Sequence, residues 1–273
     1  MNVALIENLK QPTPSGPTFL PTNLPGLVRW GKPDTMGLAD GTLVTSYPDL
    51  SGNGFNFVAS GTSPTYKANV VNGLGAILYD GSTTWMSCDT LGHVFTGVNV
   101  PFTWFGVVKH TQVPIAINLA NPGHQCYWIL AQLVASGQTH DLFVRTESYS
   151  RWSDRRNDAA TLELSFGMGD FLDLAWRRLI FTFDGTLSTM YADGIIASAF
   201  NQNAGQLTLD ILTYGAHRRP ANGIDSFLWA YMAEEGWYNN ALSAGNVALL
   251  DAYLAKRYAL SGVVPWDPWQ LLT

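Results

Sequence analysis

The fold is decided by Leu179-Ile-Phe-Thr-Phe-Asp-Gly185, followed by Leu187-Ser-Thr-Met-Tyr-Ala-Asp-Gly194 and Ile195-Ile-Ala-Ser-Ala199. The three runs are rich in aliphatic and aromatic residues, and the first two end in Asp-Gly. Glycine accepts the positive φ of a tight turn without strain, so Asp-Gly between such runs indicates a β-hairpin. The stretch therefore predicts three consecutive antiparallel strands.

The same pattern continues on both sides of this stretch. Residues 102–108 are typical of a buried strand. Residues 207–212 alternate between apolar and polar side chains, as in a strand with one face exposed to solvent. Many turn-bounded strands with little helix between them favour a β-sandwich. The exception is 244–258, where apolar residues recur at helical spacing behind Ser243, a candidate N-cap. We expect a helix there.

The two ends differ from the domain predicted over residues 27–260. Residues 1–26 are proline-rich, which favours an extended arm over packed structure. The alternative is a disordered leader. The segment also contains apolar side chains, which could pack against a partner and which a fully solvated leader would not need. Residues 261–273 form a tail with two tryptophans, predicted to pack on the body or on another chain. The assembly residues expected in arm and tail are Leu5, Ile6, Leu9, Phe19, Leu20, Trp266 and Trp269.

Composition excludes several classes of protein. The chain has 273 residues, 47% of them hydrophobic, with a net charge of −6, so it offers no basic face for nucleic acid. It has no secretory signal and no apolar stretch near the ~20 residues that span a bilayer, so we expect no membrane insertion. Cys88 and Cys126 are too few for a disulfide framework; one bridge is an alternative to the favoured pair of buried thiols.

Three separated stretches resemble one family. They are 24–81, with Leu24-Pro-Gly-Leu-Val-Arg-Trp30, Asp49-Leu-Ser-Gly-Asn-Gly54 and Tyr79-Asp-Gly81; 176–194, with Trp176-Arg-Arg-Leu-Ile-Phe-Thr-Phe-Asp-Gly185; and 233–258, with Ala233-Glu-Glu-Gly-Trp-Tyr-Asn239. Their order is similar to that of the laminin-G-like or concanavalin A-like domains of bacterial surface proteins and tailed-phage virion proteins. The resemblance implies an all-β jelly-roll sandwich of two antiparallel sheets, with one C-terminal helix.

The resemblance also implies a glycan or protein ligand and, in some members, a calcium ion. Asp49, Asn53 and Asn56 are the weak calcium candidates, because a hard cation needs several oxygen ligands. The favoured reading of this loop is an Asx turn, in which the aspartate bonds its own backbone. No other cofactor is expected.

The residue pattern speaks against catalysis. Jelly-roll glucanases need two carboxylates on one face of a strand, and no Glu-x-Asp-x-x-Glu motif occurs. Glu163, with Asp170 and Asp173 nearby, lies in a glycine-interrupted segment, and the adjacent Glu234 and Glu235 should point to opposite faces. The five histidines lack zinc spacing, and there is no Gly-x-Ser-x-Gly elbow. We therefore expect no enzyme activity.

The strongest recognition candidate is the polar segment 147–158. Exposed aromatic residues with arginines dominate many binding interfaces, and a flat ring also stacks on a sugar. The alternative is a solvated loop whose arginines pair with neighbouring carboxylates. The candidate ligand- or partner-binding residues are Tyr149, Arg151, Trp152, Arg155 and Arg156, with Trp85 and Trp128 as secondary candidates.

These observations predict a non-enzymatic structural, decoration or adhesion protein of a phage-like virion, assembled in the host cytoplasm. Its expected partners are other virion proteins or copies of itself, and an arm that orders on docking suits assembly. The alternative is a lectin-like glycan-binding module, on a virion fibre or a cell surface, that holds a host glycan. A polysaccharide hydrolase or lyase is the third and least favoured hypothesis.

Overall fold

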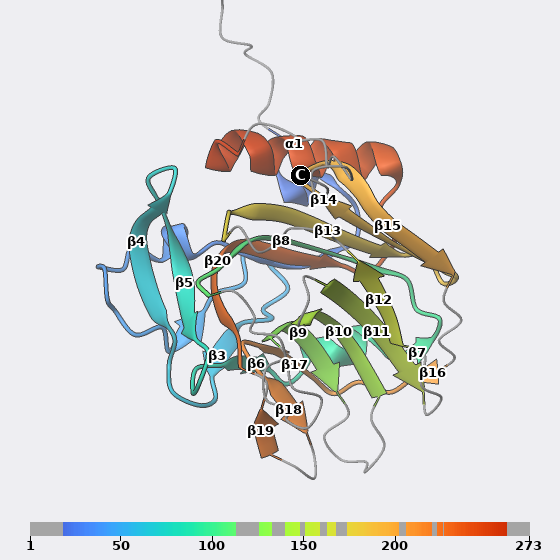
Figure 1. Ribbon diagram of the computed structural model, residues 1–273, viewed down its shortest axis with the longest axis horizontal. Helices are drawn as coiled ribbons and strands as arrows, with labels where there is room; N and C mark the ends of the chain where they lie inside the picture. Colours follow the sequence, from blue (N-terminus) through green and yellow to red (C-terminus); the bar gives the residue numbers. More distant parts are fainter. Residues whose placement is uncertain are drawn as a thin grey trace, which may run out of the picture.

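The computed structural model describes residues 19–112, 126–132, 140–147, 151–158, 163–167, 174–201, 206–219, 223–225 and 227–260. Two antiparallel β-sheets lie face to face, and helix α1 (Ala244–Tyr258) crosses the outer side of one of them (Figure 1). The predicted all-β jelly-roll sandwich with one C-terminal helix is confirmed.

The sheet beneath the helix is called sheet A. Its strands follow the order β15-β14-β13-β8-β20-β5-β4, and β1 also pairs with β20. Their bounds are β1 (Leu27–Gly31), β4 (Thr65–Val71), β5 (Leu74–Asp80), β8 (Phe102–His110), β13 (Arg177–Phe183), β14 (Leu187–Ala192), β15 (Ile195–Asn201) and β20 (Trp229–Tyr238).

The opposite layer is called sheet B, with the order β12-β11-β10-β9-β17-β6-β3-β2. Its strands are β2 (Ser46–Tyr47), β3 (Phe57–Ala59), β6 (Met86–Cys88), β9 (Cys126–Gln132), β10 (His140–Glu147), β11 (Arg151–Asp158), β12 (Glu163–Gly167) and β17 (Ile211–Tyr214). Smaller elements are η1 (Pro21–Asn23), η2 (Pro33–Met36), η3 (Leu91–Phe95), and the pairs β7 (Gly97–Val98) with β16 (Gln206–Leu207) and β18 (His217–Arg219) with β19 (Gly223–Asp225).

The predicted triple-stranded run forms β13, β14 and β15. Asp193 and Gly194 both have positive φ, 49° and 89°, as the tight turn between β14 and β15 requires. Asp184 closes the other turn by accepting hydrogen bonds from the N–H groups of Thr186 and Leu187 on its carboxylate. Local turn chemistry therefore sets the register of this half of sheet A.

The central strands of sheet A are buried on both faces. One face packs against sheet B in the main core, which includes Tyr47, Trp104 and Trp237. The other face packs against α1 through a second apolar cluster that includes Trp30 and Leu250. The side chains of sheet A must therefore satisfy two separate interiors.

Helix α1 begins as its sequence predicts. Ser243 Oγ accepts a hydrogen bond from the Asn246 N–H at 3.3 Å, which is the N-cap interaction. The helix ends at Tyr258, followed by Ala259 with a left-handed φ of 50°. No helix among the described residues is long and apolar enough to cross a bilayer.

The last part of the predicted arm lies against the domain. Phe19 packs against the helix-side cluster, and Pro21 is buried in the short helix η1. The Tyr238 hydroxyl donates to the Pro21 carbonyl at 2.9 Å. Phe19, Pro21 and Leu24 therefore anchor residues 19–26 on the domain, whereas 1–18 and the tail 261–273 lie outside the described residues.

Candidate functional site

Two adjacent glutamates in β20, Glu234 and Glu235, are fully buried. Neighbouring residues in a strand point to opposite faces of the sheet. Glu235 contacts residues of the inter-sheet core, and Glu234 contacts residues of α1 and β1 on the other side. The prediction that they point to opposite faces is confirmed.

Glu235 belongs to a buried charge network between the sheets. Arg29 Nη2 lies 3.0 Å from Glu235 Oε1, and both side chains are completely excluded from solvent. The Tyr214 hydroxyl donates a short hydrogen bond to Glu235 Oε2 and accepts one from Trp237 Nε1 at 2.8 Å. Burial raises the pKa of Glu235, and the Arg29 charge acts in the opposite direction.

Arg29 is held on all sides. Its Nη1 donates to the carbonyls of Pro48 at 2.7 Å and Trp30 at 2.8 Å. Its guanidinium lies 4.7 Å from the centre of the Tyr47 ring and 5.3 Å from that of Phe57. A planar, permanently charged group suits this mixture of ion pair and aromatic contact. The arginine therefore acts as a fixed structural cation.

Glu234 forms the matching network beneath the helix. Trp30 Nε1 donates to its Oε1 at 2.7 Å, and the hydroxyls of Tyr253 and Tyr258 donate at 3.0 and 2.9 Å. Arg257 Nε lies 3.3 Å from Oε2. Burial outweighs these contacts and raises the pKa of Glu234 to about 7. This carboxylate joins α1 to β1 and β20.

Neither carboxylate has the surroundings of a hydrolytic residue. Glycosidases place two carboxyl groups on either side of a bound sugar, with access for substrate and water. Glu234 and Glu235 are fully buried, lie on opposite faces and are already bonded to tyrosines and arginines. Their arrangement suits structural anchoring rather than acid–base chemistry.

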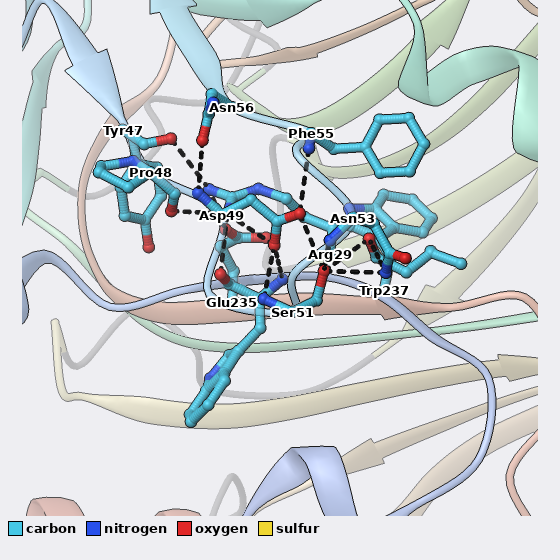
Figure 2. Close-up of polar contacts among 12 residues, drawn as sticks. Arg29, Tyr47, Pro48, Asp49, Ser51, Asn53, Phe55, Asn56, Glu235 and Trp237 are labelled. Atoms are coloured by element: carbon cyan, nitrogen blue, oxygen red, sulfur yellow. Dashed lines mark hydrogen bonds and ion pairs between the residues drawn. The ribbon is translucent and has the colours of Figure 1, made fainter.

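The carboxylate of Asp49 lies at the centre of a group of hydrogen bonds within its own loop and to β1 (Figure 2). Asp49 Oδ1 accepts the N–H groups of Trp30 and Ser51 at 3.1 and 2.8 Å, and Oδ2 accepts that of Phe55 at 3.0 Å. Burial alone would raise the pKa of Asp49. Hydrogen bonds, first of all those from Ser51, outweigh burial and hold this pKa below its ordinary value. Its oxygens already bind backbone donors, so the predicted Asx-type turn is the correct reading.

The other two calcium candidates support the same turn. Asn56 Oδ1 accepts the Asp49 N–H at 2.8 Å, and Asn53 Nδ2 donates to the carbonyls of Leu27 and Val28 at 3.1 Å each. Both amides therefore serve to hold the turn, Asn56 through its oxygen and Asn53 through its nitrogen. Within the described part of the chain, no three His, Cys, Asp or Glu side chains are grouped so as to hold a metal ion. The calcium hypothesis is not supported.

The structure corrects one recognition prediction and places four other candidates in a strand. Trp85 is only 8% exposed and packs against Gly61, so its ring is a core aromatic and not a ligand platform. The polar segment 147–158, for which a solvated loop was the alternative reading, contains strand β11, paired with β10 and β12. Arg151, Trp152, Arg155 and Arg156 are thus positions in sheet B.

The remaining candidates are placed as follows. Trp128 is in β9, and Tyr149 lies outside the described residues. Leu20 is 37% exposed, whereas Leu5, Ile6, Leu9, Trp266 and Trp269 fall outside the described ranges. Cys88 is a free, buried thiol, as expected for this member of the pair, whereas the side chain of Cys126 is outside the description. Glu163 opens β12, while Asp170 and Asp173 are outside the description.

Sequence reasoning missed Arg29 and Tyr214 as parts of a buried network. An arginine directly before a buried tryptophan in a short apolar strand was the available signal, because a charge in such a strand needs a buried partner. Its partner lies 206 residues further along the chain, at Glu235, and no local pattern connects the two.

Comparison with known proteins gives a fold but no family. No protein-family model and no curated protein matches the sequence. Among solved structures, the botulinum neurotoxin serotype G binding domain is similar over 84% of this chain and 51% of its own, with 13% identity and a TM-score of 0.61. The binding domain of Paraclostridial Mosquitocidal Protein 1 is similar over 83% of this chain and 52% of its own, with 14% identity and a TM-score of 0.58.

A third similar structure is the binding domain of botulinum neurotoxin DC in complex with SialylT. It covers 84% of this chain and 52% of its own, with 9% identity and a TM-score of 0.57. The chain spans about half the length of the solved chains that it matches. At these identities the likeness shows the fold alone. It does not bear on the virion role or the location, which stay predictions.

Proposed function

We propose that this domain is a non-catalytic carbohydrate-binding module. The observation that carries the proposal is the likeness of its sandwich to toxin binding domains, one of them solved in complex with SialylT. Fold alone does not settle function, so the proposal also needs support from the chain's own residues. It promotes the glycan alternative above the virion hypothesis.

The buried glutamates support the non-catalytic part of the proposal. Glu234 and Glu235 serve opposite faces of β20 and are closed off from solvent. Hydrolysis of a glycosidic bond would need a pair of carboxyls facing one substrate. These two glutamates hold the layers together and leave recognition to the surface.

A glycan array with the full chain, containing neutral and sialylated glycans, tests the proposal. We expect selective binding with a Kd tighter than about 1 mM. The bound glycans, incubated with the protein, should release no reducing ends. Absence of any selective binding would refute the carbohydrate proposal, whereas release of reducing ends would refute its non-catalytic part.

The Glu234→Gln variant is a useful companion in the hydrolysis assay. It removes the charge and keeps an acceptor for the tyrosine hydroxyls. If any cleavage is observed in the wild type, persistence in this variant excludes Glu234 as its acid or base.

A further inference from the structure

Beside helix α1, sheet A has one row of half-buried residues on its outer face. Partners in an antiparallel sheet lie on the same face, and neighbours along a strand alternate between faces. The adjoining row, which includes Ile77, Met232 and Val108, belongs to the inter-sheet core, so the half-buried row lies on the helix side. Its members are Thr65, Leu78, Tyr231 and Lys109.

Helix α1 covers the neighbouring part of this face. Two residues along β8 from Lys109, Val107 is fully buried in the cluster formed with α1. Ala76 has the equivalent place in β5 and is also fully buried. The row that contains Lys109 therefore lies at the side of the helix, where its side chains keep part of their surface in contact with solvent.

Two aromatic side chains lie together at this place. Trp176 comes directly before β13, whose first residue, Arg177, pairs with Val108. The centre of the Trp176 ring lies 5.8 Å from that of Tyr231, with an angle of 38° between the ring planes. Both side chains pack on the edge of the helix-side cluster and are half-buried. Aromatic rings that are supported by packing and still partly exposed suit contact with a ligand.

Lys109 adds a positive charge next to this pair. It is the register partner of Tyr231, so the Cβ atoms of the two residues lie about 5 Å apart. Within the described part of the chain, the ammonium group of Lys109 forms no ion pair and no hydrogen bond with another side chain. By contrast, Lys67 in β4 has the Asp40 carboxylate 3.7 Å away. A half-buried ammonium without a counter-ion favours binding of an anionic group.

We propose that Trp176, Tyr231 and Lys109, called the lateral strip, bind an acidic glycan. The aromatic pair stacks on the C–H face of the sugar ring, and Lys109 pairs with a carboxylate that the ring bears. This inference rests on the proposed function and names its site and its class of ligand. Ligand sites in proteins combine aromatic surface with a few polar groups in the same way.

The overall charge of the chain does not supply this attraction. The net charge is −6, which repels an anionic ligand at long range. The short-range contact with Lys109 therefore decides whether a carboxylate is accepted. The preference for an acidic glycan over its neutral form should weaken as the salt concentration rises.

The test measures Kd by ligand-observed NMR titration of the full chain. The probes are sialyllactose and a glucuronic-acid disaccharide, which distinguish the two common sources of a sugar carboxylate. Each probe is compared with its methyl ester, which keeps the ring and removes the charge. We expect at least one acidic probe to bind roughly tenfold more tightly than its ester, as a hydrogen bond to a charged group does.

Variants then locate the contact, with thermal unfolding to show that each is folded. Lys109→Met should bind the acid about as weakly as the wild type binds the ester, and Lys109→Arg should keep the preference. Lys67→Met, at the edge of the same sheet, is the matched loss of one positive charge and should bind as the wild type. Trp176→Ala should weaken acid and ester alike by about tenfold, as loss of a central aromatic contact does, and Trp176→Phe should fall between.

The outcomes separate the site from the function. Equal affinity of the wild type for acid and ester would overturn the acidic-glycan inference and leave the proposed function intact. Full preference for the acid in folded Lys109→Met, or an equal loss in Lys67→Met, would overturn the site in the same way. Self-association of the wild type that Trp176→Ala abolishes would show a second copy on the lateral strip, and would also overturn the site. Absence of selective binding to any glycan would refute the function itself.

Discussion

Replacement of Arg29 by methionine should destabilise the domain strongly. The change removes the guanidinium 3.0 Å from Glu235 and leaves that carboxylate fully buried with tyrosine hydroxyls but no positive charge beside it. Removing one partner of a buried ion pair costs about 3–5 kcal/mol, since the other charge stays uncompensated. For a domain of this size the unfolding temperature should fall by about 6 to 20 °C.

Urea unfolding followed by circular dichroism would measure this free energy at several pH values. Without Arg29 the pKa of Glu235 should rise further, so folding would take up a proton at neutral pH. The loss of stability should therefore grow as the pH rises above the ordinary glutamate value. Adding Glu235→Gln to Arg29→Met should recover much of the loss, because no uncompensated charge remains.

Lys67→Met is the matched control for the loss of a positive charge. Lys67 Nζ lies 3.7 Å from Asp40 Oδ2, and both side chains are substantially exposed. Pairs of this kind contribute at most about 1 kcal/mol. If Arg29→Met cost no more than this control, the buried network would not stabilise the fold in the way described here.

Three other predictions concern contacts elsewhere in the domain. The pKa of Glu234 is about 7 in the folded state, so the free energy of unfolding should fall by up to about 3 kcal/mol between pH 4.5 and 7. Urea unfolding at several pH values should show a smaller dependence of this free energy on pH in Glu234→Gln. Gly81→Ala should lower the free energy of unfolding by more than about 2 kcal/mol, because the new Cβ would lie 1.2 Å from Trp229 Cδ1. Gly52→Ala, the control at another positive φ, meets no atom and should lower it by about 1 kcal/mol. Tyr258→Phe should cost about 1–3 kcal/mol in the same assay by removing a buried donor; equal stability to the wild type would refute its role.

Local signals in the sequence predicted much of the fold. The turn at Asp193-Gly194 and the cap at Ser243 depend on the residues within four positions of them, and both appear as expected. The opposite directions of Glu234 and Glu235 followed from strand geometry alone. Such features need no knowledge of the rest of the chain.

Long-range features were not predictable in this way. The ion pair of Arg29 with Glu235 depends on which strands become neighbours, and the sequence contains no local record of that pairing. Strand β11 was not predicted, because its charges and lack of β-branched residues contradict strand propensity. Its place between β10 and β12 comes from the sheet, which overrides local preference.

The exposure of individual aromatic side chains also could not be predicted from the sequence. Trp85 follows an Asp-Gly turn and could have been placed on either side of the sheet. Gly61, with no side chain of its own, leaves room for the indole to lie against the backbone. That close contact involves two distant segments and could be recognised only in three dimensions.

The pairing of β1 with β20 joins two adjacent residues near one end of the domain to two near the other. Arg29 meets Glu235 in one interior, and Trp30 meets Glu234 in the second. During synthesis, Arg29 in β1 can pair with Glu235 only after β20, the last strand of the domain, has been made. A shortened chain would carry an unmatched cation into its centre, so full cooperativity of folding should arise only with the final strand in place.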